Sequence, residues 1–178
     1  MSNPLITTER LTLGLWTLDD GDIDAAHRLW GDPRVQRWAG SGRTLDREGA
    51  QRCLEAGLRH FETHGCQYFK VTSAKDGAFI GVCGLNICEG PADLELVCHL
   101  LPEYWGKGYA TEAARAVLDW AASVFHSARI TASAHPDNVA SIRLMKALGM
   151  NYREDIYYED SGVWEPVFDL KRPPHLKY

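Results

Sequence analysis

The segment from 94 to 125 constrains the fold more than any other part of the chain. Apolar and polar residues alternate over 93–101 as in a strand. A turn with Gly106 and Gly108 follows, and a helical pattern runs over 108–125. The apolar positions of that pattern recur at helical spacing, at Ala110, Ala113, Ala114, Val117, Leu118, Ala121, Val124 and Phe125, whereas Glu112, Arg115 and Asp119 face water. The sequence therefore predicts a strand that turns directly into a long amphipathic helix.

The start of this predicted helix has the chemistry of an anion site. The first N–H groups of a helix lack intrahelical partners, and the aligned peptide dipoles place partial positive charge there. Gly106 and Gly108 let ligand oxygens approach the backbone, Lys107 adds a positive charge, and the small Ala110 leaves the first turn open. The turn predicts a site for a phosphate or diphosphate group, and the alternative is a merely flexible loop.

Two known phosphate motifs do not match this turn. No glycine stands five residues before a Gly-Lys-Ser or Gly-Lys-Thr, and Thr111 occupies the place of the third glycine in a dinucleotide fingerprint. A nucleotide-binding enzyme also needs a parallel sheet, whereas three extended segments here follow one another through short turns. A nucleotide or dinucleotide site is therefore the less favoured alternative.

Strands and helices are mixed along the whole chain. The pattern predicts strands at 9–16, 67–73, 78–88, 93–101, 129–134, 151–159 and 164–172. It predicts helices from Asp19 and Asp20 to just before Pro33, at 46–63, at 108–125 and at 138–148. In the helix at 46–63 the residues expected to face inward are Ala50, Cys53, Leu54, Gly57, Leu58 and Phe61. We expect one domain over 1–178 of the α+β (mixed α/β) class, with about seven mostly antiparallel strands and about four helices.

Charge and cysteine content narrow the class of function. Nineteen Lys and Arg against 24 Asp and Glu give a net charge of −5, which disfavours a nucleic-acid partner and suits an amine or basic substrate. Five cysteines, an odd number within apolar segments, indicate a reducing compartment. We see no secretory leader and no membrane-length apolar run, so we expect a cytoplasmic protein with no membrane partner.

His60 and His64 lack the glutamate of a metalloprotease motif, and no metal site is expected.

Two segments together resemble the GNAT superfamily of N-acetyltransferases. Trp105-Gly106-Lys107-Gly108-Tyr109-Ala110 is similar to the family's Q/R-x-x-G-x-G/A turn, with Trp105 at the Gln or Arg position. Asn138 to Met150 is similar to the family's N-x-x-S/A…G-F segment, with Met145 where the family often has a tyrosine. With the opening 8–13, these runs resemble the branch of Rim-type ribosomal-protein N-terminal acetyltransferases, over residues 5 to 171.

The resemblance implies a GNAT-like fold and acetyl-coenzyme A as co-substrate. Its expected contacts are Leu101, Gly106, Lys107, Gly108, Tyr109, Ala110, Thr111, Asn138 and Ser141. The acceptor would be a primary amine, either a protein N-terminus or a small molecule, and the enzyme a monomer or homodimer. Acetyl transfer would proceed by direct attack in a ternary complex, without a covalent enzyme intermediate. The alternative is a non-catalytic acyl-coenzyme A sensor or assembly module, suggested by Met145 and Trp105.

Acyl transfer to an amine needs a proton acceptor, an oxyanion site and stabilisation of the leaving thiolate. Glu95 shares a strand face with Val97 and His99, neighbours that should raise its pKa, and it is the first choice as general base unless it is an exposed face residue. His99 is the second choice, or a structural histidine.

The remaining roles also have candidates. Ser141 would donate to the thiolate, or bond locally to the backbone. Asn138 suits a helix cap, and the resemblance adds a pantetheine contact. N–H groups near Cys98 and His99 would polarise the thioester carbonyl if a bulge opens that strand. Trp38 and Tyr68 are candidates for the acceptor pocket.

Overall fold

We describe the chain from a computed structural model, over residues 6–39, 41–87, 93–125 and 129–170. The elements in chain order are β1 (Ile6–Thr7), β2 (Leu11–Gly14), α1 (Asp20–Trp30), α2 (Pro33–Gln36), α3 (Arg47–His64), β3 (Tyr68–Ser73), β4 (Phe79–Ile87), β5 (Asp93–Leu100), a short 3₁₀ helix (Pro102–Tyr104), α4 (Tyr109–Val124), β6 (Arg129–Ser133), α5 (Val139–Ala147), β7 (Asn151–Tyr158) and β8 (Val163–Leu170).

The strands form one mixed sheet, which confirms the predicted α+β class. Its order is β1-β2-β3-β4-β5-β6-β8-β7, and only β5 and β6 pair in parallel. The described residues contain eight strands and five α-helices, one more of each than expected. The extra strand is β1, which pairs Ile6 with Leu13, and the extra helix is α2, which Pro33 begins and the Asp32 side chain caps.

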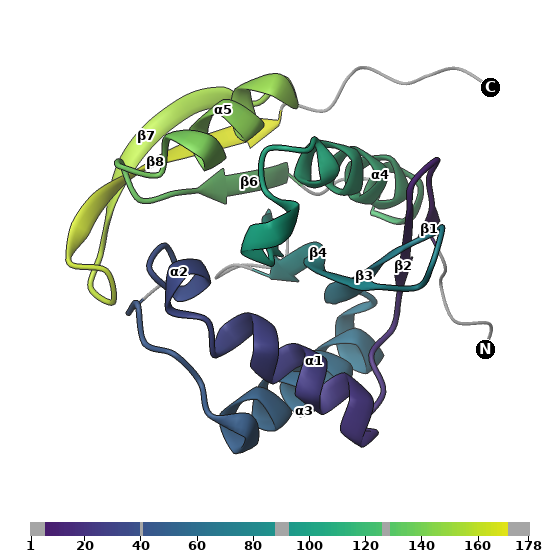
Figure 1. Ribbon diagram of the computed structural model, residues 1–178. Coiled ribbons are helices and arrows are strands. Elements are labelled where there is room, and N and C mark those ends of the chain that lie inside the picture. The colour runs from purple at the N-terminus through teal and green to yellow at the C-terminus, as the bar shows by residue number, and fades with distance from the viewer. Residues whose placement is uncertain (1–5, 40, 88–92, 126–128, 171–178) are drawn as a thin grey trace.

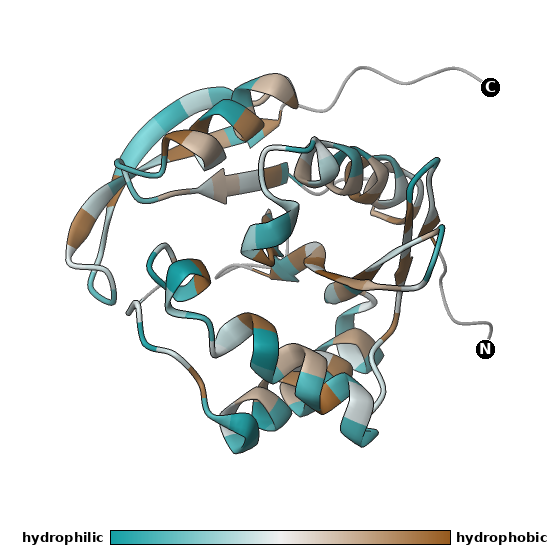
Figure 2. Ribbon diagram, viewed as in Figure 1, coloured by the Kyte–Doolittle hydropathy of each residue, from teal (hydrophilic) through white to brown (hydrophobic). Residues whose placement is uncertain are grey.

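Helices cover both faces of the sheet, with α1 and α3 on one side and α4 and α5 on the other (Figure 1). Neighbouring residues of one strand feed the two cores: Val82 packs with α1 and α3, and Cys83 packs with α4. Figure 2 shows hydrophobic colouring along the central strands and hydrophilic colouring on the outer turns of α1 and α3. Among the described residues, no helix is apolar over a length that would cross a membrane.

The ends of α3 were predicted correctly from sequence. Fewer of its residues are buried than expected. The Asp46 side chain accepts from Gly49 N, and Gly65 ends the helix with φ +76°, as the sequence predicted. Ala50 and Leu54 are buried, whereas Cys53 is exposed, so the prediction that Cys53 faces inward was wrong. Successive residues of a helix point about 100° apart, so the Cys53 side chain points away from the buried direction of Leu54 and toward solvent.

A divergence of two strands opens the sheet beside α5. The pairing of β5 with β6 runs only from Asp93 with Arg129 to Glu95 with Thr131. Beyond that point, residues 96–99 of β5 and residues 132–134 line the same cavity. The register of β5 with β4 continues without a shift from Leu94 to Leu100, so the opening comes from separation from β6 and not from the bulge we considered near Cys98 and His99.

Candidate functional site

The glycine turn and the start of α5 enclose a cleft of about 480 Å³, called here the glycine-loop cleft. Its lining includes Trp105, Gly106, Gly108, Tyr109, Ala110, Thr111, Asn138, Ala140, Ser141 and Arg143. Most of the residues predicted around the phosphate turn are therefore brought together on one wall. The indole Nε1 of Trp105 donates to Leu100 O at 2.7 Å, which anchors the turn to the end of β5.

The first turn of α4 opens without a side-chain cap. Gly108 is the N-cap residue with φ +80°, and Gly106 has φ +70°, so both lie in the left-handed region that favours glycine. The first intrahelical bond runs from Glu112 N to Gly108 O, and no side chain of the described residues caps the N–H groups before it. These N–H groups and the helix dipole make the turn suited to a diphosphate.

An arginine from β1–β2 clamps this turn from outside the cleft. Arg10 Nη1 donates to Lys107 O at 3.0 Å, and Arg10 Nε donates to Glu112 Oε2 at 2.6 Å. The guanidinium also lies over the Tyr109 ring, 4.5 Å from its centroid. Thr8 Oγ1 donates to the other Glu112 oxygen at 2.6 Å. Arg10 thus fixes the turn and offsets the negative charge of Glu112 next to the predicted anion site.

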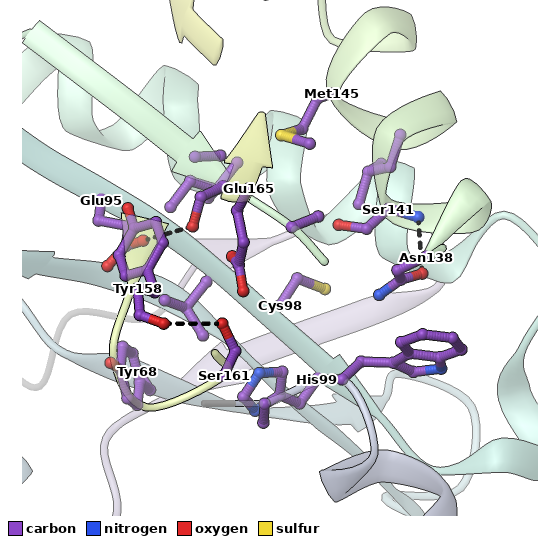
Figure 3. Close-up of a pocket in the computed structure, with 18 of the residues that line it drawn as sticks. Tyr68, Glu95, Cys98, His99, Asn138, Ser141, Met145, Tyr158, Ser161 and Glu165 are labelled. Atoms are coloured by element: carbon purple, nitrogen blue, oxygen red, sulfur yellow. Dashed lines mark hydrogen bonds between the residues drawn. The ribbon is translucent and has the colours of Figure 1, made fainter. Parts of the chain in front are cut away.

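A second cavity of about 300 Å³ adjoins the first and is called here the carboxylate pocket. Glu95, His99, Ser141, Trp38 and Tyr68, all predicted from sequence, lie on its walls. Figure 3 shows its labelled side chains, contributed by β3, β5, α5 and the β7–β8 hairpin. The two cavities share Trp38, Cys98, His99, Asn138, Ser141 and Leu144, so they lie next to each other.

Glu95 lies on the β5 face that lines this pocket. Burial raises the pKa of the Glu95 carboxyl, and the charge of Glu165 adds to the rise, whereas a hydrogen bond from Ser133 opposes it. The Ser133 hydroxyl lies 3.5 Å from Glu95 Oε1. A raised pKa of Glu95, expected from its strand neighbours, is the direction that a general base needs.

His99 is placed between the two cavities but has a weakly basic ring. Its Nδ1 atom is buried and has no hydrogen-bond partner among the described residues. Burial lowers the pKa of His99 to about 4, so the imidazole is neutral near pH 7. Since the pKa of Glu95 is raised above its usual 4.5, Glu95 is the stronger base of the two.

The start of α5 presents one hydroxyl at the junction of the cavities. Asn138 Oδ1 accepts from Ser141 N at 3.2 Å, so Asn138 is the predicted helix cap. The Ser141 residue lines both cavities, and its hydroxyl makes no hydrogen bond to another described residue. The local backbone bond considered as its alternative is not observed in this part of the chain.

Two predicted contact residues are not placed at either cavity. Leu101 is buried in the core beside α1 and α3, and its N–H donates to Ile80 O at 2.9 Å. Lys107 is exposed, and its Nζ atom lies 5.9 Å from the Tyr104 ring centroid. Neither is among the described residues that line the cavities.

Comparison with known proteins decides the family. A profile described as an acetyltransferase (GNAT) domain matches residues 10–151. The chain belongs to the GNAT acetyltransferase family. This confirms the resemblance drawn from the turn at Trp105–Ala110 and the segment from Asn138, and GNAT enzymes take their acetyl group from acetyl-coenzyme A.

Curated GNAT relatives resemble most of the chain. The "uncharacterized N-acetyltransferase p20" of Bacillus licheniformis is 29% identical over 143 residues, which is 79% of each chain. The "uncharacterized protein YkkB" of Bacillus subtilis is 30% identical over 130 residues, covering 72% of this chain and 74% of its own.

Solved structures share the fold. An acetyltransferase of the GNAT family from Bacillus anthracis has a TM-score of 0.80 at 23% identity, over 94% of this chain and 98% of its own. The ribosomal L7/L12 α-N-protein acetyltransferase RimL, in complex with coenzyme A, has a TM-score of 0.80 at 14% identity, over 94% and 97% of the two chains.

Sequence reasoning named no individual residue of the hairpin wall of this GNAT site. Tyr158, Asp160, Ser161 and Glu165 line the carboxylate pocket, yet the sequence indicated only a strand, a turn and a strand there. Strand alternation was the one available signal, since it places Glu165 on one face of β8 without saying which element lies opposite.

Two further predictions concern metals and cysteines. No group of three His, Cys, Asp or Glu that could hold a metal ion occurs among residues 6–39, 41–87, 93–125 and 129–170. Cys53, Cys66, Cys83 and Cys98 are free thiols, and Cys88 lies outside the described residues.

Proposed function

We propose that this GNAT protein transfers an acetyl group from acetyl-coenzyme A to a primary amine by direct attack in a ternary complex. The observation that carries the proposal is that the two cavities lie next to each other and share lining residues. An uncapped helix start suited to a diphosphate lies in one, a carboxylate with a raised pKa lies in the other, and Ser141 stands where they meet.

The residues of the glycine-loop cleft fit coenzyme A chemically. The N–H groups at the start of α4, with Gly106 and Gly108, would hold the diphosphate. Asn138 and Ser141 line both the glycine-loop cleft and the carboxylate pocket, and would lie beside the pantetheine arm. Bound acetyl-coenzyme A supplies an acetyl group activated as a thioester.

Proton transfer from the acceptor is assigned to Glu95. The acceptor amine must lose a proton to attack the thioester carbonyl, and Glu95 accepts it directly or through water. Burial raises the pKa of the Glu95 carboxyl, which makes the carboxylate a stronger proton acceptor. The neutral His99 ring lines the same pocket and would help to position the acceptor amine.

The negative charges on the oxyanion and on the leaving thiolate also have candidate hydrogen-bond donors. The stretch 96–99 of β5 lies beyond the pairing with β6 and lines the pocket, so backbone N–H groups there would stabilise the oxyanion. When the carbon–sulfur bond breaks, the Ser141 hydroxyl donates to the leaving thiolate. No covalent bond to the enzyme is required.

The first test is an acetyl-transfer assay. Incubation with acetyl-coenzyme A and a panel of primary amines should release free thiol in equal amount to a product that is heavier by one acetyl group, as measured by mass spectrometry. Binding of acetyl-coenzyme A without acetylation of any amine would contradict the proposed transfer and support the non-catalytic acyl-coenzyme A module.

A second prediction follows from the clamp on the glycine turn. Replacing Arg10 with alanine frees Lys107 O and leaves Glu112 uncompensated, so acetyl-coenzyme A affinity should fall about tenfold while kcat at saturation stays near wild type. Arg47→Ala is the matched control, because Arg47 pairs with Asp20 and Asp24 away from the cavities. If Arg10→Ala lowers the melting temperature but not the affinity, the residue is only structural.

A further inference from the structure

We propose that the acceptor is a small molecule with at least two amino groups, and that Glu165 and Asp160 bind the ammonium group that does not react. This inference rests on the proposed acetyl transfer and names its substrate class. It is carried by the composition, the geometry and the unsatisfied polar atom of the carboxylate pocket.

The pocket is lined by carboxylates, and no described residue on its walls carries a fixed positive charge. Glu95, Asp160 and Glu165 are on its walls, and none of the described residues that line it is a lysine or arginine. Within the described residues, neither Glu165 nor Asp160 forms an ion pair. A bound cation would therefore supply Glu165 and Asp160 with charge compensation that no described residue gives them.

The carboxylates of the pocket come from different elements of the fold. Glu95 comes from β5 and lies beside Ser133, whereas Glu165 comes from β8 and Asp160 from the β7–β8 turn. In the view of Figure 3 the Glu165 side chain reaches down between Glu95 and Ser141. Glu95 would accept the proton of the reacting nitrogen, and Glu165 and Asp160 would bind a second cationic group.

Two further observations point to an amine ligand in this pocket. His99 lines the same cavity with a neutral ring, which does not repel a bound cation, and its buried Nδ1 atom has no hydrogen-bond partner among the described residues. Trp38, Tyr68 and Tyr158 line the cavity as well, and aromatic rings favour ammonium groups. A volume of about 300 Å³ lies at the small end of ligand sites, so it suits a compact diamine better than a folded protein chain end.

The experiment compares 1,4-diaminobutane with butylamine, which has the same carbon chain but lacks the second ammonium group. For the wild-type protein, kcat/KM should be at least about tenfold higher for the diamine, as expected for one charge-assisted contact. In Glu165→Gln the ratio between the two amines should fall toward one. Glu159→Gln, which removes an exposed charge from the same hairpin outside the pocket lining, should keep the wild-type ratio.

The outcomes separate this inference from the proposed function. If neither these amines nor a peptide N-terminus is acetylated while acetyl-coenzyme A binds, acetyl transfer to an amine is wrong and the inference falls with it. If butylamine or the peptide is acetylated as fast as the diamine, and Glu165→Gln leaves the ratio unchanged, transfer stands and the diamine inference is overturned. An unchanged acetyl-coenzyme A affinity in Glu165→Gln shows that the variant is folded.

Discussion

Replacing Glu95 with glutamine should lower kcat for acetyl transfer by about 100-fold or more, with acetyl-coenzyme A affinity unchanged. The amide keeps the size of the side chain but cannot accept the proton of the attacking amine, and general-base catalysis typically contributes about 10²–10⁴-fold. Affinity should not change because Glu95 lines only the carboxylate pocket and not the glycine-loop cleft. Steady-state rates and calorimetric titration with acetyl-coenzyme A check the two parts separately.

The pH profile gives an independent readout of the same carboxyl. Burial raises the pKa of Glu95 above its usual value, so the group is protonated at pH values where an ordinary glutamate is ionised. Because the base must be ionised to act, kcat/KM should rise with pH as this raised pKa is crossed, and Glu95→Gln should lack that limb. Glu62→Gln, on the exposed face of α3, is the control. A wild-type rate and profile in Glu95→Gln would remove Glu95 from the mechanism.

Replacing Gly108 with glutamate should weaken acetyl-coenzyme A binding by more than about 100-fold. Gly108 has φ +80°, and forcing a side chain into that conformation costs on the order of 1–3 kcal/mol. A Cβ there would lie 3.4 Å from Arg10 Nη2, and the added carboxylate would repel the diphosphate at the start of α4. Strain, crowding and charge therefore act in the same direction.

A matched substitution separates the local effect from a general one. Gly77 also lies in the left-handed region, with φ +71°, and has open space around it in a turn away from the cavities. Gly77→Glu therefore imposes similar strain and the same charge, and should bind acetyl-coenzyme A like wild type in a calorimetric titration. Equal losses in the two variants, or none in Gly108→Glu, would show that the start of α4 is not the binding site.

Elements with local signals were predicted closely from sequence. Asp46 and Gly65 mark the ends of α3 because a capping side chain and a left-handed glycine act within one turn. The alternation in 93–101 identified the strand that carries Glu95. The short helix α2 was missed, since Pro33 was interpreted as the end of one helix and not as the beginning of another.

The parts of the candidate site that are contiguous in sequence were predicted, whereas the parts that depend on long-range pairing were not. The glycine turn is one contiguous run, so its residues could be named before the fold was known. The hairpin wall with Glu165 depends on β8 pairing with β6, more than thirty residues earlier, from Ile130 with Leu170 to Ser133 with Val167. Arg10 and Glu112 are 102 residues apart, and neither shows a local signal of the contact. Such long-range pairings are decided by the packing of the whole sheet.

A crystal structure with bound coenzyme A would show directly whether the start of α4 holds the diphosphate. We expect diphosphate oxygens within hydrogen-bond distance of the backbone N–H groups at 106–111, with the coenzyme sulfur beside the Ser141 hydroxyl and open toward Glu95. A diphosphate bound elsewhere on the protein, with the first turn of α4 left without it, would contradict the proposed site.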